Sequence, residues 1–414
     1  REHSSTKSHL VGQFGSCSEV PHAKADLFQW IRARHASSGV SQEALDTGTA
    51  TPFQTLNGLY IWDRCWNRRV VCELRLSEGP VLQLPRDAAT PVKLFAGRYV
   101  VLLGPAAAVG TNSPVNTATL LEEKLGMPVV NLGRGGAGPQ MFLGRSWTQL
   151  EGLFAMAHSV IVITMSGRSS PNSGMPMETG RMTKGEQNMH LISHTFTSGQ
   201  HELAKTLLRE SVTAALDNTT ALLRLTRAAA AAAGRTDPPK LFVLWISRCE
   251  LSKSVGCTAP DKAGRGWSKL PQLEFPHFID GALVAELLRR TGATLVEVPY
   301  GSLPEGEPLM VDQCAGACPA PAMDAAGARS CQADQARREL CDGIICASPT
   351  QMTSDGGKAA RAGARGRLHG VGPNATMCTT SCVSVAASSQ TYPTAAGHLL
   401  AAERLHAALE PVTP

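Results

Sequence analysis

Between residues 98 and 300, short apolar runs alternate with amphipathic segments of helical spacing. This alternation is typical of strands and helices that follow one another in a mostly parallel sheet. Each apolar run is continuous, as expected for strands that are buried on both faces. The pattern predicts an α/β fold, a three-layer sandwich with a five-stranded, mainly parallel sheet whose strands are residues 99–103, 128–132, 159–165, 240–246 and 294–298.

Four helices are predicted to cover this sheet. Their apolar residues recur at helical spacing, and each of the first three is followed by a glycine, which readily adopts the left-handed conformation at a helix end. Asp280 stands before the third helix, where its side chain can cap the first turn. The predicted helices are residues 117–125, 202–233, 282–290 and 394–409.

The pattern divides the chain into four parts. We expect residues 1–96 to be an irregular N-terminal flank with one candidate strand pair, 70–76 and 81–84. The α/β domain then covers residues 97–300. An insertion rich in Ala, Gly, Pro and Cys, without periodicity, covers residues 301–389, and the helix in residues 390–414 completes the α/β domain.

Composition excludes several classes of protein. Hydrophobic residues make up 43% of the chain, which excludes a wholly disordered protein. The net charge is +5 and no run of residues forms a basic tail, so nucleic-acid binding is not indicated. The longest apolar stretches are far shorter than the roughly 20 residues that cross a bilayer, so we expect a soluble chain without a membrane span. The chain starts at Arg1 without a secretory segment, so we expect a fragment or a processed form and leave its compartment open.

Three arginines follow three different predicted strands. Arg134, Arg168 and Arg248 all come shortly after a strand end, at the edge where open parallel sheets bind ligands. Guanidinium groups there can hold a carboxylate, sulfate or phosphate through paired donors. The set predicts a small anionic ligand, and the alternative is that each arginine is solvated or paired with a nearby acid.

Glycines follow the second strand in the spacing of a dinucleotide-binding loop, at Gly133, Gly135 and Gly138. That loop should follow the first strand and be matched by an acid at the end of the next one, and neither condition is met. We therefore expect no nicotinamide, flavin or other cofactor. A tight turn is the alternative, with the amides of Gly135 and Gly136 facing an oxyanion.

The blocks at the strand ends resemble those of SGNH or GDSL-type esterases. Gly104 and Gly110 match the glycines of that family's first block, residues 131–136 match its second block, and residues 392–398 are similar to the segment that starts its last helix. The resemblance implies the family's fold. The reactive residues differ, because the nucleophile's place holds Ala106, beside Pro105, and residues 167–170, Ser389 and Tyr392 replace the family's other reactive groups.

A closer resemblance is to a bacterial group known as domain of unknown function 6473. It is carried by stretches that occur in the same order along the chain, at residues 99–104, 130–139 with 142–143, 165–169 with 172–173, 244–248, 275–276 and 392–393. These stretches cover about residues 98–300 and 390–409. The resemblance implies a shared domain and no particular reaction.

Two reactive groups are candidates for catalysis. Ser166 follows the third strand and could act as a nucleophile with His398 as its base, although no partner acid is identifiable and His398 falls within a helix. Helix capping or ligand binding is the alternative role for Ser166. Tyr392 is a hydrogen-bond donor to a substrate or an aromatic plug against the sheet. The further candidate ligand contacts are Asn131, Ser169 and Asn172.

Seven of the 12 cysteines lie in the insertion, at Cys314, Cys318, Cys331, Cys341, Cys346, Cys378 and Cys382. Two pairs have three intervening residues, a spacing that departs from the commoner one for zinc, and only His369 is nearby. Disulfides in an oxidising compartment are therefore favoured over a metal. A tolerated insertion or a mispredicted exon remains the alternative.

Two function classes follow from these residues. The first is a hydrolase or acyltransferase that acts on a small anionic or carbohydrate-linked ester, with Gly135 and Gly136 stabilising an oxyanion and the three arginines holding the anionic group. The second is a non-catalytic anion- or carbohydrate-binding module that has lost the catalytic triad.

Overall fold

The structure is a computed structural model, in which the chain forms two compact units. The first contains residues 1–311 and 391–414, and the second contains residues 312–390. Apart from Asp312, the second unit lies outside the described residues, and with it lie the seven cysteines of the predicted insertion. The structure describes residues 9–21, 24–47, 49–56, 59, 70–86, 91–110, 115–176, 185–247, 250–252, 276, 278–299, 310–312, 391–393 and 395–409.

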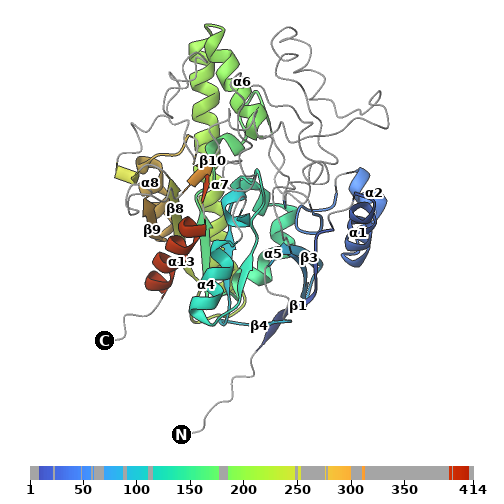
Figure 1. Ribbon diagram of the computed structural model, residues 1–414. Helices are drawn as coiled ribbons and strands as arrows, with labels where there is room; N and C mark the ends of the chain where they lie inside the picture. Colours follow the sequence, from blue (N-terminus) through green and yellow to red (C-terminus); the bar gives the residue numbers. More distant parts are fainter. Residues whose placement is uncertain are drawn as a thin grey trace, which may run out of the picture. The chain divides into compact units, whose positions relative to one another are not determined.

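A five-stranded parallel sheet forms the centre of the first unit. Its strands are hydrogen-bonded in the order β6-β5-β7-β8-β9, and every neighbouring pair is parallel. Two of them, β8 and β9, are labelled in Figure 1. The α/β class and the five predicted strands are confirmed. The strands are β5 (Val100–Leu103), β6 (Val129–Asn131), β7 (Ser159–Ile163), β8 (Lys240–Ser247) and β9 (Thr294–Pro299).

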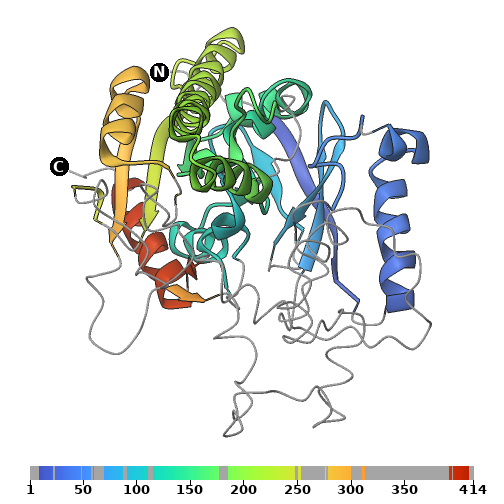
Figure 2. The ribbon, with the colours of Figure 1, turned by 90° about the horizontal axis from the view of Figure 1, so that it is seen from above.

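Helices cover both faces of this sheet. Side chains alternate along each strand, so Val101 and Val160 share a core with α5 and α7, whereas Val100 and Ile161 share a core with α4 and α13. Figure 2 shows α7 and α13 on opposite faces of the sheet. The helices are α3 (Ala106–Val109), α4 (Thr117–Leu125), α5 (Arg145–Ala155), α6 (Gly185–Thr197), α7 (His201–Ala232), α8 (Gly281–Thr291) and α13 (Ala395–Leu409).

The predicted helices form where local capping chemistry marks their ends. Asp280 Oδ1 accepts a hydrogen bond from the Leu283 amide at 2.9 Å, and Gly292 ends α8 with a φ of 61°. Helices α5 and α6 were not predicted. The N-cap of α5 is Gly144, which has no side chain to accept a hydrogen bond, so the helix lacks the usual start signal.

The N-terminal segment contains a four-stranded antiparallel sheet in the order β3-β2-β1-β4, and is thus more regular than expected. Only β2 and β3 were predicted. Strand β1 has a register shift between Phe14 and Cys17, which interrupts the alternation that reveals a strand. The elements here are β1 (Leu10–Glu19), α1 (Lys24–Ser37), α2 (Gln42–Asp46), β2 (Val70–Leu76), β3 (Val81–Pro85) and β4 (Lys93–Phe95).

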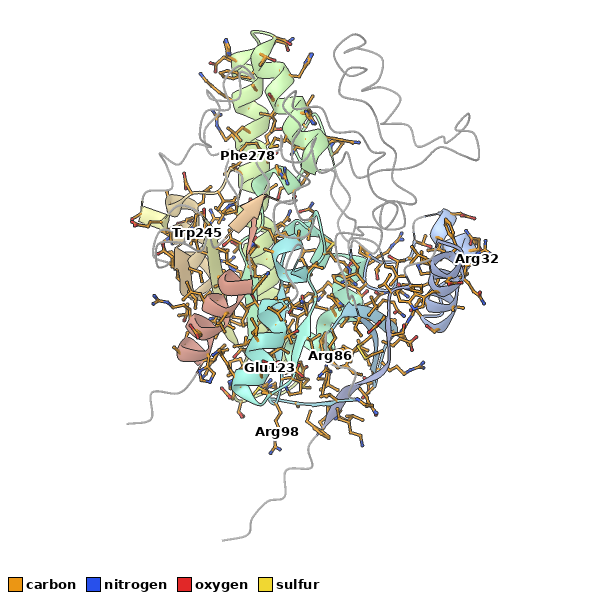
Figure 3. All side chains as sticks on the ribbon, viewed as in Figure 1. Arg32, Arg86, Arg98, Glu123, Trp245 and Phe278 are labelled. Atoms are coloured by element: carbon orange, nitrogen blue, oxygen red, sulfur yellow. A yellow bond between two sulfur atoms is a disulfide. The ribbon has the colours of Figure 1, made fainter. Side chains whose placement is uncertain are left out.

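The two sheets share one hydrophobic core. Phe14 and Leu74 of the antiparallel sheet belong to the same buried cluster as Tyr99 and Phe142. Arg86, which is labelled in Figure 3, lies over the Phe14 ring at 4.4 Å and forms an ion pair with Glu122 of α4 at 2.5 Å. The N-terminal sheet is therefore packed against the α/β part of the chain by apolar contacts and by a partly buried charge pair.

Short elements complete the described fold. Two 3₁₀ helices follow β6 and β7, and two short strands pair with each other outside the main sheets. No helix in the described ranges is long and apolar enough to cross a membrane. These short elements are η1 (Pro139–Phe142), η2 (Gly167–Ser169), β10 (Met310–Asp312) and β11 (Thr391–Pro393).

A disulfide joins β1 to β2 between Cys17 and Cys72, which are opposite each other in the antiparallel pair. The two cysteines are 55 residues apart in sequence, so the bond closes a long loop. Because such a bond restricts the unfolded chain, we expect replacement of both cysteines by alanine to lower the free energy of unfolding by about 2–4 kcal/mol.

Urea unfolding of the double variant and of the unaltered protein, both without reductant, measures this loss. Peptide mapping under non-reducing conditions checks the bond directly. Two free thiols at these positions in the unaltered protein would contradict the assignment.

Candidate functional site

The order of the strands reverses between β5 and β7, since β6 lies beyond β5 on one side and β8 lies beyond β7 on the other. In open parallel sheets the ligand site lies outside the carboxyl ends of the strands at such a point. Three loops meet this condition, and we number them in chain order. The first loop is residues 104–110, the second is residues 132–138 and the third is residues 164–176.

The first loop carries no nucleophilic side chain. Ala106, which stands where SGNH-type esterases have their nucleophile, begins α3 and is 4% exposed. Pro105 precedes it without a side-chain capping bond. A Cβ on Gly104 would lie 2.8 Å from the Ile163 Cβ, so this loop is pressed against β7. The first loop therefore contributes shape and backbone groups.

Asn131 ties the first loop to the second. Its Nδ2 donates to the Ala108 carbonyl at 2.6 Å, and its Oδ1 accepts from the Gly133 amide at 2.8 Å. A Cβ on Gly133 would lie 2.7 Å from the Ala108 Cβ, so glycine is required for this close approach. The predicted ligand contact at Asn131 is thus a buried side chain that holds the two loops together.

Gly135 and Gly136 form a turn, which was the structural alternative for these glycines. The Ala137 amide donates to the Arg134 carbonyl at 3.1 Å, and Gly136 has a φ of 73°, a conformation that favours glycine. Gly135 is buried and Gly136 is half-buried. The second loop thus contains the tight turn that was the alternative for these glycines.

Arg134 points toward the N-terminal sheet. Its guanidinium donates to the carbonyls of Pro52 at 3.3 Å, Gln83 at 2.5 Å and Gly133 at 2.9 Å, and it lies over the Phe53 ring at 5.0 Å. The side chain is 0% exposed, and burial lowers the pKa of Arg134 to about 9. This geometry does not support the expected role of Arg134 in holding an anionic ligand, because its guanidinium already donates to three backbone carbonyls.

Arg168 remains a candidate for ligand binding. It lies in η2 of the third loop, is half-buried, and places Nη1 3.9 Å from the Met189 sulfur of α6. Arg248, the third arginine of the predicted set, lies outside the described residues. Of the three arginines, the structure therefore places one in the third loop and turns another away from it.

The third loop is held by the second. Gln140 Nε2 donates to the Ser169 carbonyl at 2.6 Å. A Cβ on Gly138 would lie only 2.0 Å from that same carbonyl oxygen. Ser166 starts η2 and is buried, as is Ser169, which was predicted as a ligand contact. The glycine spacing that resembles a dinucleotide-binding motif thus serves the contact between two loops.

Asn172 belongs to a buried polar network that sequence reasoning missed. Its Nδ2 donates to Asn188 Oδ1 at 2.5 Å and to Ser211 Oγ at 2.9 Å, and Asn188 Nδ2 donates to the carbonyls of Arg168 at 2.9 Å and Ser170 at 3.0 Å. The network fastens the third loop to α6 and α7.

Ser166 and His398 do not form a hydrogen-bonded pair. His398 is fully buried in α13, and its Nδ1 lies 2.8 Å from Thr117 Oγ1 of α4. Within the part of the chain that the structure describes, its Nε2 has no hydrogen-bond partner. Burial lowers the pKa of His398 to about 3, so the ring is neutral at neutral pH. The side chain of Tyr392 lies outside the described part.

Among the residues that the structure describes, no group of three or more His, Cys, Asp or Glu side chains could hold a metal ion. No protein-family model, no curated protein and no solved structure matches the chain. Inference about function therefore depends on the loop residues themselves.

Replacing Gly138 by alanine tests the contact between the second and third loops. The added Cβ would overlap the Ser169 carbonyl, so we expect the free energy of unfolding to fall by about 1–3 kcal/mol. Gly152→Ala is the matched control, because Gly152 is exposed in α5 and a Cβ there meets nothing within 4 Å. That control should raise stability by about 0.5–1 kcal/mol, as measured by urea unfolding. Equal effects of the two substitutions would argue against the contact.

The burial of His398 predicts a pH dependence of stability. The unfolded chain takes up a proton near pH 6.5, whereas the folded protein resists it down to about pH 3. The free energy of unfolding should therefore fall by up to about 1.4 kcal/mol for each pH unit below 6.5, and His398→Asn should remove this part of the loss. Unfolding curves at several pH values measure it, with His406→Asn in the same helix as control. Parallel pH profiles for the protein and the His398 variant would rule out this effect.

Proposed function

We propose that the chain is a non-catalytic ligand-binding protein of SGNH-like architecture, a three-layer sandwich that holds a small anionic or carbohydrate ligand at the loops after β5, β6 and β7. The strand order β6-β5-β7-β8-β9 supports this architecture, because it is the order of flavodoxin-like sheets. Helices on both faces support it as well. The resemblance to domain of unknown function 6473 fits the same proposal.

One observation favours binding over hydrolysis: the nucleophile's place holds the buried methyl group of Ala106. A serine hydrolase needs a nucleophile, a base and an orienting acid connected by hydrogen bonds. Ser166 is the remaining candidate nucleophile, and His398 forms its hydrogen bond with Thr117 instead. The groups for acyl transfer are therefore not connected in the described residues.

The third loop supports an anionic ligand. Arg168 supplies a positive charge there, and the residue is half-buried, so it is partly shielded from water. The contacts of Asn131, Gln140 and Asn172 hold the surrounding loops without a ligand. A preorganised site of this kind loses little conformational freedom when a ligand binds.

Thermal unfolding with a panel of sulfated, phosphorylated and carboxylated metabolites and neutral sugars tests this function. A ligand at 100 times its Kd should stabilise the native protein by about 2.7 kcal/mol and raise its Tm. Arg168→Ala should weaken binding of an anionic ligand at least about tenfold, because a hydrogen bond to a charged group is lost. Arg209→Ala, an exposed position of α7, should leave binding unchanged.

An ester assay separates binding from catalysis. Hydrolysis of p-nitrophenyl acetate by the protein should equal that of the Ser166→Ala variant. Turnover that requires Ser166 would overturn the non-catalytic proposal in favour of a hydrolase. A panel in which no compound raises the Tm would argue against ligand binding at these loops.

A further inference from the structure

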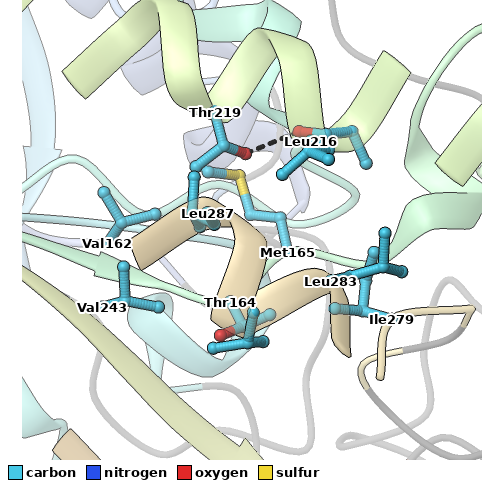
Figure 4. A pocket seen from close by; sticks show the side chains of 11 residues that line it. Val162, Thr164, Met165, Leu216, Thr219, Val243, Ile279, Leu283 and Leu287 are labelled. Atoms are coloured by element: carbon cyan, nitrogen blue, oxygen red, sulfur yellow. Dashed lines mark hydrogen bonds between the residues drawn. The ribbon is translucent and has the colours of Figure 1, made fainter. Parts of the chain in front are cut away.

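A cavity lies beside the third loop, between the main sheet and two helices. Its floor is formed by Val162 of β7 and Val243 of β8, which are paired neighbours in the sheet. Its walls come from α7 and α8 (Figure 4). The cavity volume is about 30 Å³, and the space is partly open to solvent.

The cavity exists because α7 presents small side chains toward α8. Ala215 and Thr219 are four residues apart, so they lie on one face of α7, and both line the cavity. From α8, Leu283 and Leu287 approach the same space. A leucine at position 215 would fill it, and alanine leaves it open.

The lining specifies an apolar occupant. Its two hydroxyl groups belong to Thr164 and Thr219, and both donate to backbone carbonyls, those of Leu244 at 3.1 Å and Ala215 at 2.7 Å. Every other lining side chain is apolar. A water molecule needs two to four polar partners, so this cavity binds water weakly. An alkyl group loses no hydrogen bonds on entering and gains the free energy of apolar burial.

We propose that this cavity is a binding site for the end of an unbranched alkyl chain, about two to three carbons of which fit inside. The open mouth lets the rest of the molecule extend outside. The proposal depends on the cavity's own lining and holds whether or not Arg168 binds an anion.

A series of straight-chain carboxylates from acetate to hexanoate tests the site, with Kd measured from methyl NMR shifts. Each buried methylene contributes about 0.8 kcal/mol, so Kd should fall about fourfold per carbon and then level off. Ala215→Leu should abolish this chain-length dependence. Ala228→Leu, at an exposed position of the same helix, should preserve it.

Two further variants keep the test decisive if Ala215→Leu fails to fold. Leu283→Ala enlarges the cavity and should move the levelling point to longer chains. Thr219→Val keeps the shape and should leave the series unchanged, since the hydroxyl bonds to its own helix. A chain-length dependence that is absent from the unaltered protein, or unchanged by both size-altering variants, would overturn the site. Arg168→Ala separates the two proposals, because the cavity predicts an unchanged chain-length slope in this variant, whereas weaker binding of the whole series would report on the anion site alone.

Discussion

The buried guanidinium of Arg134 is the interaction on which the arrangement of the loops depends. It carries a charge into a region with no exposure to solvent, where an unpaired charge would cost many kcal/mol. Its acceptors are three backbone carbonyls, two of which, those of Pro52 and Gln83, come from the N-terminal segment. The N-terminal sheet thus completes the hydrogen bonding of the second loop. Removing that sheet would leave the charge of Arg134 buried with too few acceptors or would expose the loop, so the segment is part of the folded unit and not an appendage to it.

The same loop then determines the position of the next. With the second loop held by Arg134 on one side and by Asn131 on the other, Gly138 and Gln140 are in place to contact the carbonyl of Ser169. The third loop is fixed in turn, with further support from Asn172. The polar side chains of Asn131, Arg134 and Asn172 at the strand ends therefore bind other parts of the protein.

The sequence predicted the elements whose positions depend on residues close to them in the chain. The five buried strands are continuous apolar runs, and α4 and α8 carry an N-cap and a terminal glycine, so both could be located from sequence. Strand β1 escaped prediction because its bulge interrupts the alternation, and α5 because Gly144 gives no capping signal. At the site, sequence placed the arginines at the strand ends but could not give their directions. Whether Arg134 reaches a ligand or a carbonyl depends on residues 52 and 83, which are far away in sequence and are brought near by the antiparallel sheet.

Several arginines of this fold bind backbone carbonyls, whether they are buried or exposed. A guanidinium offers the same donors to a backbone carbonyl as to a phosphate or carboxylate. Arg235 uses them on the carbonyls of Ala155 and Ala157, where α5 ends, and Arg227 uses them on the carbonyls of Thr291 and Gly292 at the end of α8. Such contacts also place the positively charged guanidinium at the negative end of the helix dipole, where a cation is stabilised. A fully buried arginine such as Arg134 cannot exchange its carbonyls for a ligand without breaking the packing around it. Arg168 is half-buried, so part of the residue is open to solvent without any such change in packing.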